Sequence, residues 1–255
     1  MQQLRRLSGR RAARLEEGAF VIEGPTLLEV ALDAGVTIRE VFAAPEAAGK
    51  LLVRAEGAGA IVHEVAAQVL ERSLDTVTSQ GVAAIAARDD VGVEAAVAAS
   101  ATGPLALVLI DVGDPGNAGT LVRAAEAAGA AAVLFCGESV DPWNPKCVRA
   151  SAGTLFHIPV SSGGDPVSVV QLLEAAGVRS AATVVRDGTP YDAADLRGPL
   201  AVVLGNEAHG LPASIVDQVD LRLTIPMAGR AESLNVAMAG SVLCFESLRQ
   251  RRAGG

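Results

Sequence analysis

The stretch LRLTIPMAGRAESLNVAMAGSVLCFESLR, residues 221–249, decides the fold of this chain. Its first residues alternate between apolar and polar side chains, which is typical of a short strand, and Pro226 ends it because proline cannot donate to a sheet. From Leu234 onward apolar residues recur at helical spacing, with Ser233 as the predicted N-cap. Asn235 lies in the first turn, where small polar groups face exposed backbone N–H groups. The stretch predicts a strand, a polar loop and a helix whose start is either a simple cap or one wall of a ligand site.

Continuous apolar runs in the second half of the chain have the composition of buried strands. Residues 105–110 (LALVLI) and 200–204 (LAVVL) carry no polar side chain, as is usual for central strands of a parallel sheet. Further strands are expected at 156–160 and 180–185, and a helix at 120–128. This alternation predicts an α/β fold in which helices cover a parallel sheet.

The first half of the chain has the pattern of a smaller α/β module. Strands are expected at 20–23, 38–43 and 82–87, with helical patterns between them. A stretch rich in Ala, Ser and Gly follows and ends at Gly103-Pro104. The predicted organisation is a domain at residues 1–90, a linker at 91–104 and a second domain at 105–255.

Charge is distributed unevenly along the chain. The net charge of −8 argues weakly against binding to nucleic acid. The first 14 residues nevertheless contain no acidic residue and carry five arginines, which are Arg5, Arg6, Arg10, Arg11 and Arg14. This segment is either a basic arm that binds RNA phosphates or a solvated N-terminus.

Cysteine and apolar patterning exclude several classes of protein. The three cysteines are odd in number and widely spaced, so no metal site or disulfide framework is expected. No apolar run reaches the roughly 18 residues that a membrane span requires, and we expect no signal peptide. We therefore expect a soluble, cytoplasmic protein that binds no metal and no membrane.

Three polar, glycine-containing loops follow presumed parallel strands, at residues 111–119, 205–210 and 226–233. The carboxyl ends of parallel strands meet at one edge, where open α/β sheets bind their ligands. The first loop is not a GxGxxG motif and there is no P-loop, so nicotinamide and nucleoside triphosphate sites are poorly supported.

Each of these loops carries a short motif. In chain order the motifs are Asn117-x-Gly119-x-x-x-Arg123, Gly205-Asn206-Glu207-x-x-Gly210-Leu211, and Ile225-Pro226-Met227 followed by Glu232-Ser233-Leu234-Asn235-Val236. Together they resemble the three ordered motifs of the SpoU branch of the SPOUT methyltransferases, which methylate RNA ribose 2′-hydroxyls with S-adenosylmethionine. The resemblance covers roughly residues 104–250.

The resemblance implies a fold and an assembly. An α/β trefoil-knot domain with a parallel sheet would follow a small L30e-like α/β domain that binds the RNA substrate. The weaker likeness to that first domain lies in Phe20-Val-Ile-Glu-Gly24 and Thr78-Ser-Gln-Gly-Val82. The family works as a homodimer in which each active site uses residues of both subunits.

The resemblance also implies roles for individual residues. Arg123 would lie at the reacting hydroxyl, and because a guanidinium stays protonated it would stabilise the developing alkoxide rather than act as a base. Asn117 would orient Arg123 or the ribose, and Glu207 would hold Arg123 or the loop. Ser233 and Asn235 would bind the cofactor or the target nucleotide. Residues implied to hold S-adenosylmethionine are Leu204, Gly205, Asn206, Ile225, Met227, Ser233 and Leu234.

The predicted function is therefore methylation of a ribose 2′-hydroxyl in RNA, with 23S ribosomal RNA as the favoured substrate. Arg149 and the N-terminal arginines are expected to contact that RNA. A transfer RNA methyltransferase remains open, as does a non-catalytic RNA-binding protein that has kept the fold.

Overall fold

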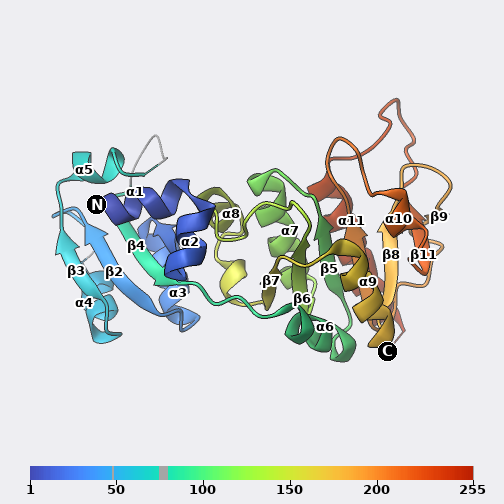
Figure 1. Ribbon diagram of the computed structural model, residues 1–255, viewed down its shortest axis with the longest axis horizontal. Coiled ribbons are helices and arrows are strands. Elements are labelled where there is room, and N and C mark those ends of the chain that lie inside the picture. The colour runs from blue at the N-terminus through green and yellow to red at the C-terminus, as the bar shows by residue number, and fades with distance from the viewer. Residues whose placement is uncertain (48, 75–79, 255) are drawn as a thin grey trace. The chain divides into compact units, whose positions relative to one another are not determined.

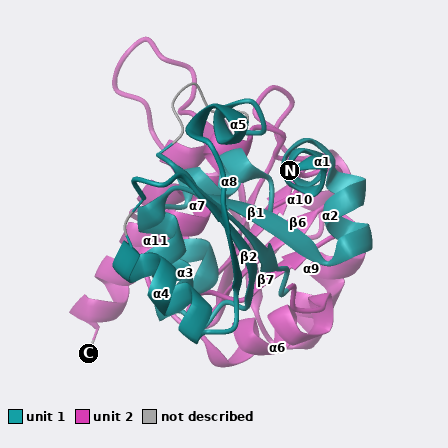
Figure 2. Cartoon of the chain, turned by 90° about the vertical axis from the view of Figure 1, so that its left-hand side faces the viewer, with its two compact units in different colours: residues 1–89, 143–157 teal, residues 90–142, 158–255 magenta. Residues whose placement is uncertain are grey.

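The computed structural model describes residues 1–47, 49–74 and 80–254, and the chain forms two compact units. Unit 1 contains Met1–Asp89 and Trp143–His157, and unit 2 contains Asp90–Pro142 and Ile158–Gly255 (Figure 2). The chain therefore passes between the units three times. Part of the Thr78–Val82 motif lies outside the described residues.

Unit 1 is a four-stranded sheet with helices on both faces (Figure 1). Its strands are β1 (Ala19–Glu23), β2 (Ile38–Ala43), β3 (Ile61–Glu64) and β4 (Val82–Ala87). Its helices are α1 (Gln2–Gly9), α2 (Arg11–Glu17), α3 (Pro25–Asp33), α4 (Gly49–Gly57), α5 (Ala67–Glu71) and α8 (Pro145–Ala150), with a 3-10 turn at Thr154–Phe156. The strand order is β1-β4-β2-β3, and only β2 and β3 are parallel.

Aromatic packing explains why Trp143–His157 belongs to unit 1. The ring of Phe20 on β1 lies 4.6 Å from that of Trp143 and 6.0 Å from that of Phe156, measured between centroids. Arg149 on α8 donates to Glu23 at 2.6 Å. The predicted strand at 156–160 is therefore wrong, because Phe156 packs in unit 1 and the next strand starts only at Val160.

The N-terminal segment forms two helices joined at a corner. Arg14 is only 2% exposed, and its Nη1 donates to the carbonyl oxygens of Leu7 at 2.6 Å and Ser8 at 3.2 Å. The prediction that Arg14 contacts RNA is therefore wrong, because its guanidinium stabilises this corner. The other four arginines are exposed, and Arg6 forms an ion pair with Glu17.

Unit 2 is a seven-stranded sheet in which every paired strand is parallel to its neighbour. Its strands are β5 (Ala106–Ile110), β6 (Ala132–Cys136), β7 (Val160–Ser162), β8 (Arg179–Thr183), β9 (Thr189–Pro190), β10 (Leu200–Leu204) and β11 (Leu221–Thr224). Its helices are α6 (Val93–Thr102), α7 (Pro115–Ala127), α9 (Pro166–Ala175), α10 (Ala213–Val216) and α11 (Val236–Ala253). The order is β7-β6-β5-β10-β8-β11-β9, and the apolar runs of β5 and β10 are buried throughout.

The helices of unit 2 lie on both faces of this sheet. A core cluster joins α6, α9 and α10 to one face, and α7 and α11 pack together over β5 and β10 on the other. The predicted linker contains α6, whose Ala96 and Val97 are buried in that core. No helix in the described residues is long and apolar enough to cross a membrane.

The starts of α7 and α11 differ from the predicted ones. The N-cap of α11 is Asn235 rather than Ser233, since the Asn235 Oδ1 accepts from the N–H groups of Ala237 at 2.9 Å and Met238 at 3.3 Å. Helix α7 starts five residues before Thr120, and its N-cap is Asp114. Both helices therefore begin at the carboxyl edge of the sheet, next to the loops that carry the motifs.

Close approach of α11 to the sheet depends on Gly240. A methyl group there would overlap Leu121 Cδ2 on α7 and lie 2.8 Å from Leu204 Cδ1 on β10. We expect Gly240→Ala to lower the free energy of unfolding by about 1–3 kcal/mol, measured by urea denaturation, because the core must move to admit the methyl group. Gly9→Ala is the control: its methyl group meets open space, and stability should stay equal or rise by up to about 1 kcal/mol.

Candidate active site

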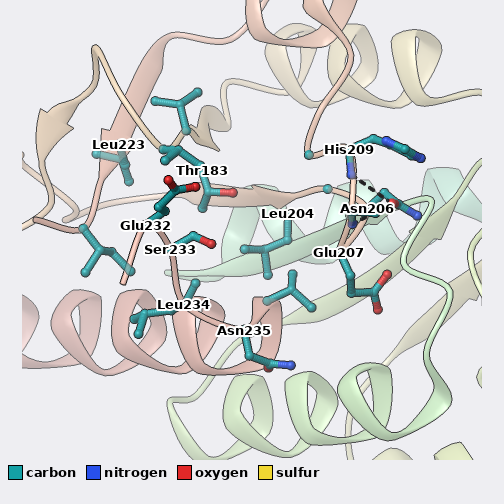
Figure 3. Close-up of a pocket in the computed structure, with 18 of the residues that line it drawn as sticks. Thr183, Leu204, Asn206, Glu207, His209, Leu223, Glu232, Ser233, Leu234 and Asn235 are labelled. Carbon is teal, nitrogen blue, oxygen red and sulfur yellow. Dashed lines mark hydrogen bonds between the residues drawn. The ribbon is translucent and has the colours of Figure 1, made fainter. Parts of the chain in front are cut away.

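A cavity of about 500 Å³ opens at the carboxyl ends of β8, β10 and β11 (Figure 3). Its lining residues are Thr183, Val184, Val185, Leu204, Gly205, Asn206, Glu207, Ala208, His209, Gly210, Leu223, Ile225, Met227, Glu232, Ser233, Leu234, Asn235, Val236 and Ala239. The cavity lies beside the point where the strand order reverses, between β5 and β10, which is the place that open α/β sheets use for ligands.

The loop after β10 folds back on itself beside the cavity. Asn206 and Gly210 exchange backbone hydrogen bonds of 3.2 and 2.9 Å. A side chain on Gly205 would lie 2.6 Å from the Gly210 oxygen, so only glycine fits at this position. The Asn206 side chain donates to the carbonyl oxygen of Asp111 at 2.8 Å, which ties this loop to the end of β5.

Three side chains connect the three motifs, and we call them the amide bridge: Glu207, Asn117 and Asn235. The Asn117 Nδ2 donates to Glu207 Oε1 at 3.0 Å, and its Oδ1 accepts from Asn235 Nδ2 at 3.0 Å. Since Asn235 uses its oxygen to cap α11, only its nitrogen is available to Asn117. The amide bridge therefore has one direction, with the carboxylate at one end and the start of a helix at the other.

Glu207 also fixes the loop before α7. Its carboxylate accepts from the backbone N–H groups of Gly113 at 3.2 Å and Asp114 at 3.1 Å. Burial acts to raise the pKa of Glu207, but hydrogen bonds from the Asn117 amide and from backbone N–H groups outweigh it and hold this pKa below its usual value. Of the two predicted roles for Glu207, holding Arg123 or holding the loop, the geometry matches the second.

All seven residues predicted to hold the cofactor line the cavity, together with Glu207 and Asn235. Asn117 reaches the cavity wall through the amide bridge, where its side chain is hydrogen-bonded to Glu207 and Asn235. Arg123 is exposed on α7 and is not among the lining residues of its own chain. Sequence reasoning missed Thr183, Val184 and Val185, because they carry no motif and only the strand order places β8 beside β10.

The chemistry of the lining suits a small cation with an apolar part. Apolar side chains such as Leu204, Ile225 and Leu234 form one wall, and two carboxylates, Glu207 and Glu232, are present without any lysine or arginine in the lining. The volume is in the range of sites that enclose a small ligand, about 300–1,000 Å³. S-adenosylmethionine, with an adenine ring and a sulfonium, fits this set of residues.

Two protein-family models match this chain. The model described as the SpoU rRNA Methylase family matches residues 104–245, and the model of the MRM3-like substrate binding domain matches residues 1–84. The Bacillus subtilis 23S rRNA (guanosine(2553)-2′-O)-methyltransferase RlmP is 33% identical, covering 91% of this chain and 89% of its own length.

Solved structures agree with these matches. An rRNA methyltransferase from Sinorhizobium meliloti with bound AdoMet has a TM-score of 0.87 at 31% identity, covering 97% of this chain and 93% of its own. The SpoU methyltransferase AviRb from Streptomyces viridochromogenes, in complex with AdoMet, has a TM-score of 0.86 at 26% identity and covers 99% of this chain and 98% of its own.

The parallel seven-stranded sheet with a ligand cavity at its carboxyl edge defines a methyltransferase of the SPOUT class. Within that class, the chain belongs to the SpoU rRNA methylase family. It is an S-adenosylmethionine-dependent RNA methyltransferase that acts on a ribose 2′-hydroxyl, so the predicted fold class, cofactor and activity are confirmed.

Asn117→Asp should make the stability of the protein depend on pH. The substitution puts a second carboxylate against Glu207, where one of the two pKa values must rise. In the natural protein the pKa of Glu207 is lower in the folded state than in the unfolded state. Its ionised carboxylate therefore stabilises the fold above the pKa of the unfolded state, and this stabilisation is lost as the pH falls through the pKa of the folded state. We expect the melting temperature of Asn117→Asp to be lower than that of the natural protein at both pH 8 and pH 5. The difference between the two proteins should be larger near pH 8 and smaller near pH 5, where the two carboxylates can share a proton.

Circular dichroism melts at the two pH values provide the measurement. Asn117→Ala is the control, since it breaks the amide bridge without adding charge. A deficit in Asn117→Asp that is the same at both pH values would contradict the geometry of the bridge.

Proposed function

We propose that this enzyme methylates a ribose 2′-hydroxyl of 23S ribosomal RNA, in the cytoplasm, and that it works as a homodimer without a metal ion. The similarity to a 23S enzyme along nearly the whole chain supports the ribosomal substrate, because the substrate-binding unit is included in the match. A metal is unnecessary because a methyl group on a sulfonium is already electrophilic.

The observation that carries this proposal is the amide bridge at the wall of the cavity. The bridge makes the first motif, on α7, dependent on the two loops that line the cavity. When bound, S-adenosylmethionine supplies a methyl group on a positively charged sulfur. Leu204, Ile225 and Leu234 would cover its apolar part, while backbone groups of Gly205, Asn206 and Met227 would bind its polar edges. Ser233 and Asn235 would position the cofactor or the target nucleotide.

Arg123 would complete the active site of the partner subunit. Its side chain is exposed on α7, which packs against α11, and α11 exposes the apolar side chains of Met238 (61%) and Phe245 (49%). Exposed apolar side chains on a helix that packs against α7 favour a second copy of the chain as the cover of α11. There the guanidinium would stabilise the developing alkoxide and hold the adjacent phosphate, while water or that phosphate accepts the proton.

Unit 1 would bind the RNA through its exposed arginines. Arg5, Arg10 and Arg11 are exposed on α1, α2 and the turn between them, where they can neutralise phosphates. Arg149 is partly buried and already pairs with Glu23, so any contact of Arg149 with RNA competes with that ion pair.

Mapping of 2′-O-methyl groups tests the substrate. Ribosomal and transfer RNA from cells with and without the gene should differ at a position in 23S ribosomal RNA, and the gene should restore the methyl group. A position lost only in transfer RNA would contradict the ribosomal assignment.

Arg123→Ala should separate chemistry from cofactor binding. We expect single-turnover methylation of the mapped RNA to slow by at least about a hundredfold, because a preorganised charge at the oxyanion is lost. Calorimetry without RNA should show that affinity for S-adenosylmethionine changes by less than about twofold, since the proposed partners of Arg123 are the ribose oxygen and the RNA phosphate rather than the cofactor. Arg222→Ala, which removes an exposed arginine elsewhere in unit 2, is the matched control.

Mixed dimers test whether the active site is shared. Ser233→Trp fills the cavity of its own subunit, so it should be inactive alone, as Arg123→Ala is. Dimers with one subunit of each kind, purified through two different tags, should recover about half of the natural activity, because one pocket faces an intact Arg123. Inactive mixed dimers, or failure to isolate any dimer, would overturn the shared site.

A further inference from the structure

The ionisable residues that line the cavity differ in whether their side chains form hydrogen bonds. Among the lining residues, only Glu207, Glu232 and His209 have ionisable side chains, and the lining contains no lysine or arginine. Figure 3 shows Glu232 beside Thr183 and Ser233 on one side of the cavity, whereas Glu207 lies on the other side near Asn206. The cavity is therefore lined by one glutamate on each side.

The two carboxylates have different surroundings. Glu207 accepts hydrogen bonds from the Asn117 amide and from two backbone N–H groups. These bonds use its carboxylate to fix the loops in place. Glu232 makes no hydrogen bond or ion pair with any residue in the described parts of the chain, and it is exposed to the solvent of the cavity. Its position within the third motif is not explained by capping, since Asn235 is the cap of α11.

Methyl transfer changes the charge of the ligand. The methyl group moves from sulfur to the ribose oxygen, the hydroxyl proton leaves to water or phosphate, and the sulfonium becomes a neutral thioether. The cofactor thus carries one more positive charge than its product, S-adenosylhomocysteine, while the two molecules otherwise share the same groups. A carboxylate near the ligand stabilises the two forms unequally.

We propose that Glu232 is a specificity-determining residue that makes this cavity prefer the sulfonium cofactor over the thioether product. The inference rests on the proposed binding of S-adenosylmethionine in this cavity. The preference would favour exchange of spent product for fresh cofactor after each turnover. Because Glu232 is exposed, solvent screens its field, and the discrimination is expected to be about threefold to fivefold, falling as salt rises.

Three ligands measured by titration calorimetry test this role. S-adenosylmethionine carries a sulfonium, sinefungin carries a protonated amine in its place, and S-adenosylhomocysteine carries a neutral sulfur. Glu232→Gln should weaken binding of the two cationic ligands by about threefold to fivefold and leave the neutral one within about 1.5-fold. Glu174→Gln, which removes an exposed carboxylate on α9, should change none of the three dissociation constants.

Two results of this titration would overturn the role proposed for Glu232. Equal weakening of all three ligands would make Glu232 a general binding or structural residue, and unchanged binding would remove it from the site, so both results overturn the proposal. Ser233→Trp separates this failure from a wrong location of the cofactor. If that variant, which fills the cavity, still binds S-adenosylmethionine as the natural protein does, the cofactor binds elsewhere and the proposed site itself fails.

Discussion

The side-chain amide of Asn117 holds the active-site edge of this protein together. It can donate to Glu207 and accept from Asn235 only in one orientation, because a carboxylate accepts and the Asn235 oxygen is already used by α11. Three loops that are far apart in the sequence are thereby fixed to one another. An amide is suited to this place because a carboxylate would repel Glu207, and an apolar group would remove one hydrogen bond from Glu207 and the hydrogen bond of the Asn235 Nδ2.

The parallel sheet provides the frame for this bridge. Strands β5 and β10 are adjacent and buried on both faces, so the loops after them emerge side by side at the same edge. Gly240 lets α11 lie close to Leu121 and Leu204, which brings Asn235 to the same edge from the other end of the chain. The cavity wall thus combines a rigid strand end with loops whose positions depend on a few hydrogen bonds.

Much of this arrangement could be predicted from the sequence, and the exceptions have physical reasons. The apolar runs at 105–110 and 200–204 identify buried parallel strands because few other elements lack polar residues over that length. The sequence pattern predicts Ser233 as the cap of α11, whereas the structure has Asn235, because serine and asparagine cap equally well and only the backbone conformation decides between them. Thr183 cannot be identified from the sequence, because the order of strands in the sheet cannot be predicted from local residue patterns.

Two other differences arise from long-range packing. Charge patterning treats Arg14 as a surface residue, whereas its guanidinium is buried against the carbonyl groups of a helix corner. Trp143 and Phe156 lie within the sequence of the methylase domain, yet their rings pack on Phe20 of unit 1. Contacts of this kind depend on residues distant in the chain, which neither periodicity nor a motif can report.

A crystal structure with S-adenosylmethionine bound tests the central claim most directly. The amide bridge is expected to persist, with Asn117 within hydrogen-bond distance of both Glu207 and Asn235, and the cofactor should lie in the cavity against Leu204 and Leu234. A cofactor bound outside this cavity, or an Asn117 side chain turned away from either partner, would contradict the account.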